Sequence, residues 1–204
     1  MRGAVMISLC LAVGAPAAAC PMGLEAARAG VEVTYDDDAF ATFVLEDGGI
    51  TRELTLYVGP GDPDGDGYVV RALHGLYFLE DLALEGGALL PEYSEVVTFA
   101  APLDELPAPE PGLRWSGWAM VALGDDAPFP REVSLSVGAA EELMIGACRY
   151  ENWPVLLRHR DEIEDLLRGM AYLPELGIAL VQVLGDYGGA ADVFTPLSIV
   201  PAAP

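Results

Sequence analysis

The chain consists of short apolar runs separated by turns rich in glycine and aspartate. Apolar and polar residues alternate in the segments 52–58, 132–137 and 178–184, as they do in strands with one buried face. Gly86-Gly87 and Gly188-Gly189 separate neighbouring runs, and such pairs form tight hairpin turns. Because these connections are too short for crossover helices, the sequence predicts antiparallel hairpins along most of its length.

The same criteria place further strands between the turns. They cover residues 31–35, 41–45, 68–73, 76–84, 95–100, 114–123, 143–157 and 193–200. We therefore expect a mainly β fold, in which an antiparallel meander forms a curved sheet or an open barrel. Such a sheet buries one face and needs another element to cover it.

One segment has helical periodicity instead. Four apolar residues recur there at helical spacing, namely Ile163, Leu166, Leu167 and Met170. Asp161 precedes them as a candidate N-cap, with Glu164 three residues later as in a capping box. The sequence thus predicts one amphipathic helix near 161–170 that covers the sheet with its apolar side.

The first nineteen residues have the layout of a secretory signal peptide. Arg2 precedes an apolar run over 4–13, and small residues over 14–19 end in an A-x-A pattern. The run is about half as long as the roughly twenty residues that a membrane-spanning helix needs. We expect cleavage after Ala19, and hence a periplasmic or secreted protein.

Domain organisation follows from length and from one proline-rich segment. Removal of residues 1–19 from the 204 leaves 185, enough for a single mainly-β domain over 20–204. The segment 101–112 contains four prolines. We expect it to be a stiff loop at the sheet edge, since the alternative, a linker, would separate two halves that are each small for independent folding.

The cysteines link export to structure. Cys10 leaves with the signal peptide, so that Cys20 and Cys148 remain, an even pair in an oxidising compartment. We expect a disulfide between them. One alternative is a lipoprotein anchored at Cys20, which would make the membrane a partner and leave Cys148 a free thiol. A second is cleavage after Ala29, which would remove Cys20.

Charge excludes one class of partner. The chain has 32 acidic and 10 basic residues, for a net charge of -22, and all the basic residues are arginines. Such a surface repels nucleic acid and anionic lipid, and the absence of lysine excludes the lysine-containing phosphate loop. The composition is typical of a GC-rich bacterial gene.

The motif most like a site is the run Asp62, Asp64 and Asp66, which imitates the start of a calcium loop. Leu73 stands where such a loop has its bidentate glutamate, so a solvated turn is the favoured interpretation and calcium the alternative cofactor. A second acidic cluster, 36–38, is interpreted as a strand end.

Catalytic motifs are weak. His74 lies at a strand break, and His159 lies between two arginines before the predicted helix, where we expect surface exposure. No serine nucleophile motif occurs. With so many acids, a hydrolase working through paired carboxylates stays open as an alternative.

A limited resemblance concerns the C-terminal half. The segment 145–155 (IGACRYENWPV) and Tyr172-Leu-Pro-Glu-Leu-Gly177 resemble bacterial periplasmic β-rich proteins that have a tyrosine, a proline and a PELG turn leading into the next strand. The resemblance covers about a third of the chain. It implies a half-barrel similar to that of lipoprotein carriers, with no activity attached.

These observations lead to one functional hypothesis. We expect an exported protein that acts without catalysis, either by binding or in envelope structure. Its partner would be an apolar ligand, held in a groove of the curved sheet, or an envelope protein. The alternatives are a calcium-stabilised extracellular module and a carboxylate hydrolase.

Overall fold

The computed structural model describes residues 20–36, 39–57 and 65–203. Within them it has one α-helix, α1 (Gly23–Ala29), and three 3-10 helices, η1 (Asp47–Gly49), η2 (Pro91–Tyr93) and η3 (Leu103–Glu105). The strands are, in chain order, β1 (Val31–Tyr35), β2 (Phe40–Leu45), β3 (Ile50–Leu56), β4 (Gly67–Leu73), β5 (Tyr77–Glu85), β6 (Ala88–Leu89), β7 (Glu95–Phe99), β8 (Arg114–Leu123), β9 (Phe129–Val137), β10 (Glu141–Ile145), β11 (Cys148–Arg160), β12 (Asp165–Leu173), β13 (Ile178–Asp186), β14 (Ala191–Val193) and β15 (Pro196–Pro201).

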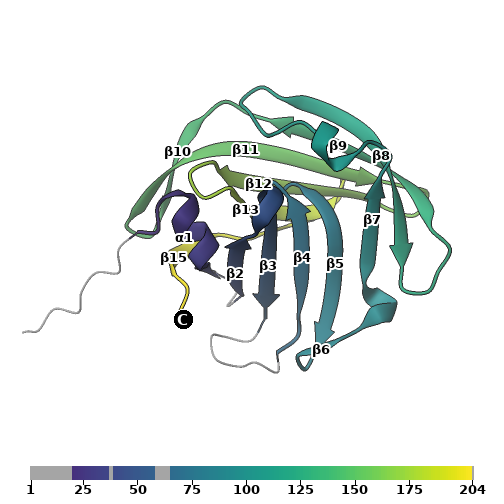
Figure 1. Ribbon diagram of the computed structural model, residues 1–204, viewed down its shortest axis with the longest axis horizontal. Coiled ribbons are helices and arrows are strands. Elements are labelled where there is room, and N and C mark those ends of the chain that lie inside the picture. The colour runs from purple at the N-terminus through teal and green to yellow at the C-terminus, as the bar shows by residue number, and fades with distance from the viewer. Residues whose placement is uncertain (1–19, 37–38, 58–64, 204) are drawn as a thin grey trace, which may run out of the picture.

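All of these strands belong to one antiparallel sheet that is not closed. Its order is β14-β13-β12-β11-β9-β8-β7-β5-β4-β3-β2-β1-β15, with β6 beside β5 and β10 beside β11 (Figure 1). Neighbours in the sheet are mostly neighbours in sequence, because tight turns join them. The predicted antiparallel meander in a curved sheet is therefore confirmed.

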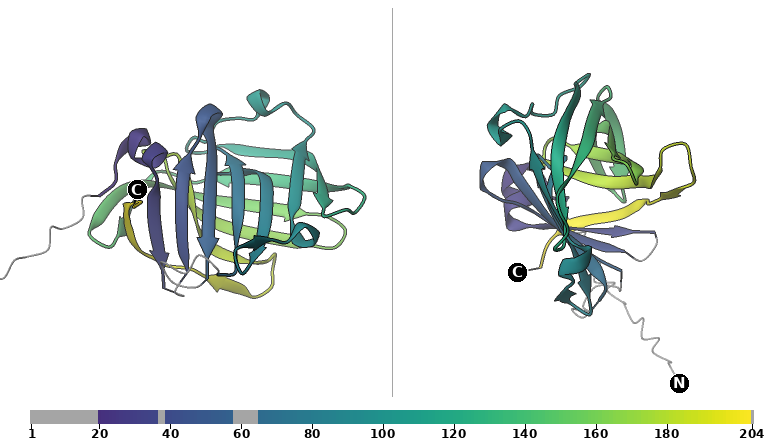
Figure 2. Two further views of the ribbon diagram at one scale, coloured as in Figure 1. Left: turned by 60° about the horizontal axis from the view of Figure 1, so that its bottom comes forward. Right: turned by 90° about the vertical axis from the view of Figure 1, so that its right-hand side faces the viewer.

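The sheet folds over on itself, so that its two halves face each other. In Figure 1, β2 to β5 stand upright while β11 and β12 run across them. The same crossing is seen after the rotation on the left of Figure 2, where the upright strands lie in front of the others. This curvature creates a concave face between the halves.

The segment from β14 to β15 connects the two edges of the sheet. The backbone N–H of Phe194 donates a hydrogen bond to Gln182 O on β13 at 2.9 Å. One residue later, Thr195 N donates to the Asp36 carboxylate at 2.8 Å, just beyond β1. The chain thus leaves one edge and reaches the other within two residues, which brings β13 close to β1.

The core lies on the concave face and has two parts. One part lies where α1, β1, β2 and β15 meet the ends of β12 and β13, and the other extends from β4 and β5 across to β9, β11 and β12. Burial alternates along the strands that line it, for example at Val31, Val33 and Tyr35 of β1. This is the pattern of a sheet with one covered face.

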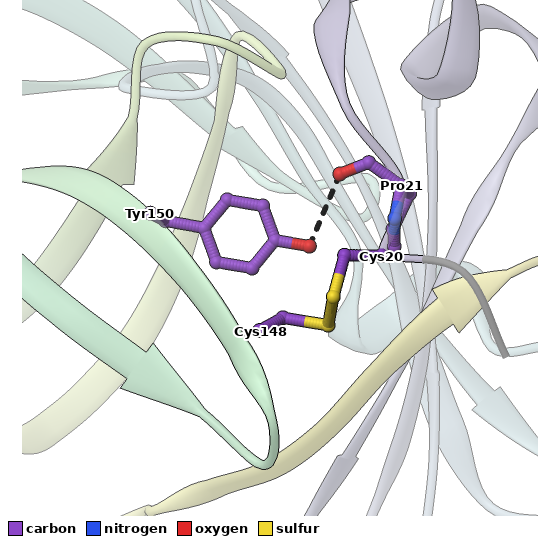
Figure 3. Close-up of a disulfide and its surroundings, with 4 residues drawn as sticks. All are labelled: Cys20, Pro21, Cys148 and Tyr150. Carbon is purple, nitrogen blue, oxygen red and sulfur yellow. Dashed lines mark hydrogen bonds between the residues drawn. A yellow bond between two sulfur atoms is a disulfide. The ribbon is translucent and has the colours of Figure 1, made fainter. Parts of the chain in front are cut away.

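A disulfide fixes the N-terminal segment to the sheet. Cys20 is bonded to Cys148 at the start of β11, as predicted. Beside it, the Tyr150 hydroxyl donates a hydrogen bond to Pro21 O at 3.1 Å (Figure 3). The helix that follows, α1, has seven residues, and no described helix is long and apolar enough to cross a membrane.

The predicted helix near 161–170 is wrong. Residues from Asp165 onward form β12, which pairs with β11 on one side and β13 on the other. Asp161 does cap, but it caps a turn: its carboxylate accepts hydrogen bonds from Ile163 N and Glu164 N, both at 2.8 Å. Ile163 is 86% exposed. Because this segment pairs with a strand on each side, the strand pairing outweighs the helical periodicity, which is a local property of these residues.

Two predicted strands are divided in the structure. The segment 143–157 is a hairpin of β10 and β11, with Gly146 in the left-handed region at φ 58° in its turn. The segment 193–200 is divided between β14 and β15. The proline-rich segment 101–112 is a loop between β7 and β8, and its Leu106 is buried in the core.

Removal of the disulfide tests its role in holding the N-terminal segment. The bridge joins residues that are 128 positions apart in the sequence. The double variant, Cys20→Ala with Cys148→Ala, should therefore have an unfolding free energy, measured in urea, about 2 to 5 kcal/mol lower than that of the wild-type protein. Reductant should destabilise the wild-type protein by a similar amount and leave the double variant unchanged. Equal unfolding free energies for all samples would contradict this role.

Candidate functional site

The inner face of β3 is polar. Thr51, Glu53 and Thr55 are buried, whereas Leu54 and Leu56, on the opposite face, are partly exposed. A strand normally turns its apolar face to the core, and burial of a carboxyl group costs free energy. The concave face therefore carries a feature that hydrophobic burial alone does not explain.

Strand register extends this polarity into an acidic row. Glu53 lies opposite Val70 of β4, and Val70 lies opposite Asp81 of β5. Asp81 in turn lies opposite Glu95 of β7. Because directly opposite residues point to the same face of a sheet, Glu53, Asp81 and Glu95 share the concave face. We call these three residues the acidic row.

Basic side chains come from the other half of the sheet. Arg131 of β9 donates hydrogen bonds to both carboxylate oxygens of Glu95, at 2.7 and 2.9 Å. It also donates from Nε to Asp161 at 2.9 Å. Arg168 of β12 lies 3.8 Å from the Asp81 carboxylate. The two halves of the folded sheet are thus joined by ion pairs across the concave face.

His159 lies beside Arg168 and corrects an expectation from the sequence. The sequence predicts an exposed side chain here, and this prediction is wrong. Alternation along β11 turns His159 inward, where it is 7% exposed and its ring packs edge-on against Phe78. Burial first, and then the charges of Arg168 and Arg131, hold the pKa of His159 well below its usual value. The neutral ring accepts a hydrogen bond at Nδ1 from Arg168 Nη1 at 3.0 Å.

A cavity of about 230 Å³ lies between the two halves of the sheet. The elements around it are β1 and β3 to β5 on one side, and β12, β13 and the segment after β14 on the other, which are seen crossing in Figure 2. Its polar lining comprises Glu53, Thr55, Asp81 and Arg168. Its aromatic lining comprises Tyr35, Tyr57, Tyr68, Phe78 and Phe194.

Glu53 is the most unusual group in this cavity. It accepts hydrogen bonds from the Thr55 hydroxyl at 2.8 Å and from the Tyr68 hydroxyl at 3.4 Å. Among the described residues, no cationic side chain lies within ion-pair distance of it. Burial, and then the charge of Asp81, raise the pKa of Glu53 to about 7, while the hydrogen bonds from Thr55 and Tyr68 and the charge of Arg168 each lower it. Its protonation therefore changes near neutral pH.

The other two charged groups of the cavity, Asp81 and Arg168, form an ion pair. Burial raises the pKa of Asp81, and the charge of Arg168 partly offsets that effect. Arg168 also stacks its guanidinium 4.6 Å from the centre of the Phe78 ring. It is therefore engaged by a carboxylate, an imidazole and an aromatic face at once.

The residues proposed for calcium are only partly described. Asp62 and Asp64 lie outside the described residues. The Asp66 carboxylate accepts a hydrogen bond from Gly86 N at 3.1 Å, which makes it a partner of the adjacent hairpin turn. Over the part of the chain that is described, no three acidic, histidine or cysteine side chains are grouped as metal ligands. Calcium binding therefore stays the untested alternative to a solvated turn.

The remaining candidates have local roles. Of the cluster 36–38, Asp36 is described, and its hydrogen bond from Thr195 N lowers its pKa. His74 adopts φ 55° in the turn between β4 and β5, and burial lowers its pKa.

Sequence reasoning missed the residues that line the cavity. Alternation along 52–58 does put Glu53, Thr55 and Tyr57 on one face, but it does not say which face is buried. Arg168 was hidden because its segment was predicted to be helical. The sequence signal that could have identified these residues is a strand with one polar face, next to strands whose acidic side chains point to the same side of the sheet.

Comparison with known proteins yields no match: no family model matches the chain, and no curated protein or solved structure is significantly similar to it. The description of the molecule therefore rests on its structure: an open, curved antiparallel sheet with a polar cavity on its concave face.

Replacement of Glu53 by glutamine tests the buried carboxyl group. Its pKa is raised from 4.5 to about 7 on folding, so its contribution to stability is fully present below pH 4.5 and is lost as pH rises to 7. Relative to Glu53→Gln, the wild-type protein should lose about 3 kcal/mol of unfolding free energy over that interval. Urea unfolding at several pH values measures this difference, and a constant difference from pH 4 to 8 would contradict it.

Proposed function

We propose that this protein is an exported, non-catalytic binding protein that holds a small ligand in the cavity of its folded sheet. The observation that carries the proposal is the cavity itself, because it is lined by a few polar groups among aromatic rings. That combination is typical of small-molecule sites, in which apolar walls supply contact area and a few polar groups fix orientation.

The size of the cavity limits the ligand. Its volume of about 230 Å³ lies below the roughly 300–1,000 Å³ of sites for drug-sized ligands. The ligand should therefore be small, with about the bulk of one ring or one short branched chain. Tyr57 is 53% exposed, which places one wall of the cavity next to solvent.

Export is supported by two features. The Cys20–Cys148 disulfide is compatible with an oxidising location such as the periplasm or the extracellular medium. The predicted signal peptide, residues 1–19, lies outside the described residues and ends directly before Cys20. If Cys20 is the first residue of the mature protein, this disulfide anchors the new N-terminus.

A second candidate function is favoured by one observation. Glu53 and Asp81 line the same cavity, and a carboxyl group with a raised pKa beside a second carboxylate is the arrangement of many hydrolases. We favour binding because Asp81 is paired with Arg168 and is not free to act on a substrate. Turnover of small glycosides that is lost in Glu53→Gln would support the hydrolase instead.

Native mass spectrometry of protein from its own host tests the binding function. The wild-type protein should carry a small molecule that is absent from Val70→Phe, because Val70 lines the cavity and the larger ring would fill it. Val69→Phe is the matched control, since Val69 is the next residue on β4 and does not line the cavity. It should keep the ligand.

Two results would overturn the proposal. One is wild-type protein that carries no bound molecule and takes none up from a native extract. The other is equal retention by the Val69 and Val70 variants, which would place the ligand elsewhere.

A further inference from the structure

The cavity has more negative than positive side chains on its wall. Two carboxyl groups, Glu53 and Asp81, line it together with one guanidinium, that of Arg168. Arg168 forms its ion pair with Asp81, whereas the hydrogen bonds described for Glu53 come from the hydroxyl groups of Thr55 and Tyr68. Glu53 is nine-tenths buried, and the charge of Arg168 offsets only part of the burial that raises its pKa. Among the described residues its carboxylate is left without a cation at ion-pair distance, which a buried carboxylate needs.

Arg168 is poorly placed to receive an anionic ligand. Its Nη2 faces Asp81, its Nη1 donates to His159, and Phe78 lies under its guanidinium plane. An anion would have to replace the Asp81 carboxylate or bind beside it, where the two like charges would repel. The acidic row thus disfavours anions in this cavity.

The aromatic lining favours a cation. Five rings line the cavity, those of Tyr35, Tyr57, Tyr68, Phe78 and Phe194, and one face of Phe78 already carries the Arg168 guanidinium. The face of an aromatic ring is negative, and rings gathered around a carboxylate are the usual cage for alkylated ammonium groups. Alkylated ammonium groups also fit the apolar part of the wall, because their charge is spread over methyl groups that need no hydrogen-bond partner.

The charge of the whole molecule acts in the same direction. With a net charge of -22, the protein attracts small cations toward its surface and raises their local concentration at a cleft. Long-range attraction and the lining of the cavity therefore select the same sign of charge.

We propose that the ligand of this cavity is a small organic cation, an alkylated amine or quaternary ammonium compound, whose charge lies beside Glu53 and against the surrounding rings. This inference rests on the binding function proposed above and specifies its ligand class. When the cation binds to protein in which Glu53 is protonated, Glu53 loses its proton to solvent and the carboxylate pairs with the ligand.

The proposal predicts pH-dependent binding. The titratable and charged groups that face Glu53 come from each packed element: Tyr35 of β1, Tyr57 after β3, Tyr68 of β4, Asp81 of β5 and Arg168 of β12. β13 contributes only Val181 and Leu184 to the cavity. Because the pKa of Glu53 is about 7, its ionised fraction rises roughly tenfold from pH 6 to pH 8, and affinity for a cation should rise with it.

An isosteric series of probes tests the sign of the charge. Choline, 3,3-dimethylbutan-1-ol and 3,3-dimethylbutanoate share the same branched head and are positive, neutral and negative respectively. Measured by NMR titration at pH 8, choline should bind about tenfold more tightly than the neutral alcohol, and the anion should bind most weakly. Choline should also weaken about tenfold at pH 6.

Two variants assign the effect to Glu53. Glu53→Gln keeps the shape of the side chain and should remove both the preference for choline and its pH dependence. Glu85→Gln is the matched control, because Glu85 is exposed at the end of β5 and its substitution removes the same charge away from the cavity. This variant should behave as the wild-type protein does, and unfolding curves confirm that both variants fold.

Each other outcome has a defined meaning. If the alcohol or the anion binds as tightly as choline, the cation inference is overturned and the binding function stands. If none of the three binds, the cation inference is overturned, and the mass measurement on native protein decides separately whether the cavity holds any ligand. If Glu85→Gln loses as much affinity as Glu53→Gln, the effect is one of net charge and the site is wrongly assigned.

Discussion

Burial of charged groups between the two halves of the sheet is the constraint on which the remaining structure depends. The curved sheet brings strands from its two halves face to face, and the facing side chains include the acidic row, Arg131 and Arg168. Arg131 is 5% exposed and bonded to Glu95 through both carboxylate oxygens. Removal of one partner from such a buried pair typically costs about 3–5 kcal/mol, so these pairs fix how the two halves meet.

Glu53 differs from Asp81 and Glu95 because no described cationic side chain forms an ion pair with it, and the charge of Arg168 offsets only part of the effect of its burial. A core built for stability alone would place an apolar residue here, as Val31 and Val33 are placed on β1. The raised pKa of Glu53 means that the folded state is penalised above neutral pH. Proteins keep such costs mainly at functional sites, and a bound cation would remove this one.

The sequence predicted the fold class and the disulfide because both depend on local signals. Alternation and turn residues define most strands, and the two cysteines that follow the predicted signal peptide leave one pairing. The cavity depends on long-range register instead: Glu53 meets Asp81 only through Val70 on the strand between them. Segment 161–170 failed for the same reason, since Leu166, Arg168 and Met170 fit a helix locally and a strand once β11 and β13 pair beside them.

The most direct measurement is the ¹³C NMR titration of the Glu53 side-chain carboxyl in the ligand-free protein, assigned by comparison with Glu53→Gln. The account predicts a midpoint near pH 7, because the group is buried and no described cation forms an ion pair with it. A midpoint near pH 4 would contradict it, since an ordinary pKa would mean that the carboxylate is already solvated or paired and has no need of a ligand.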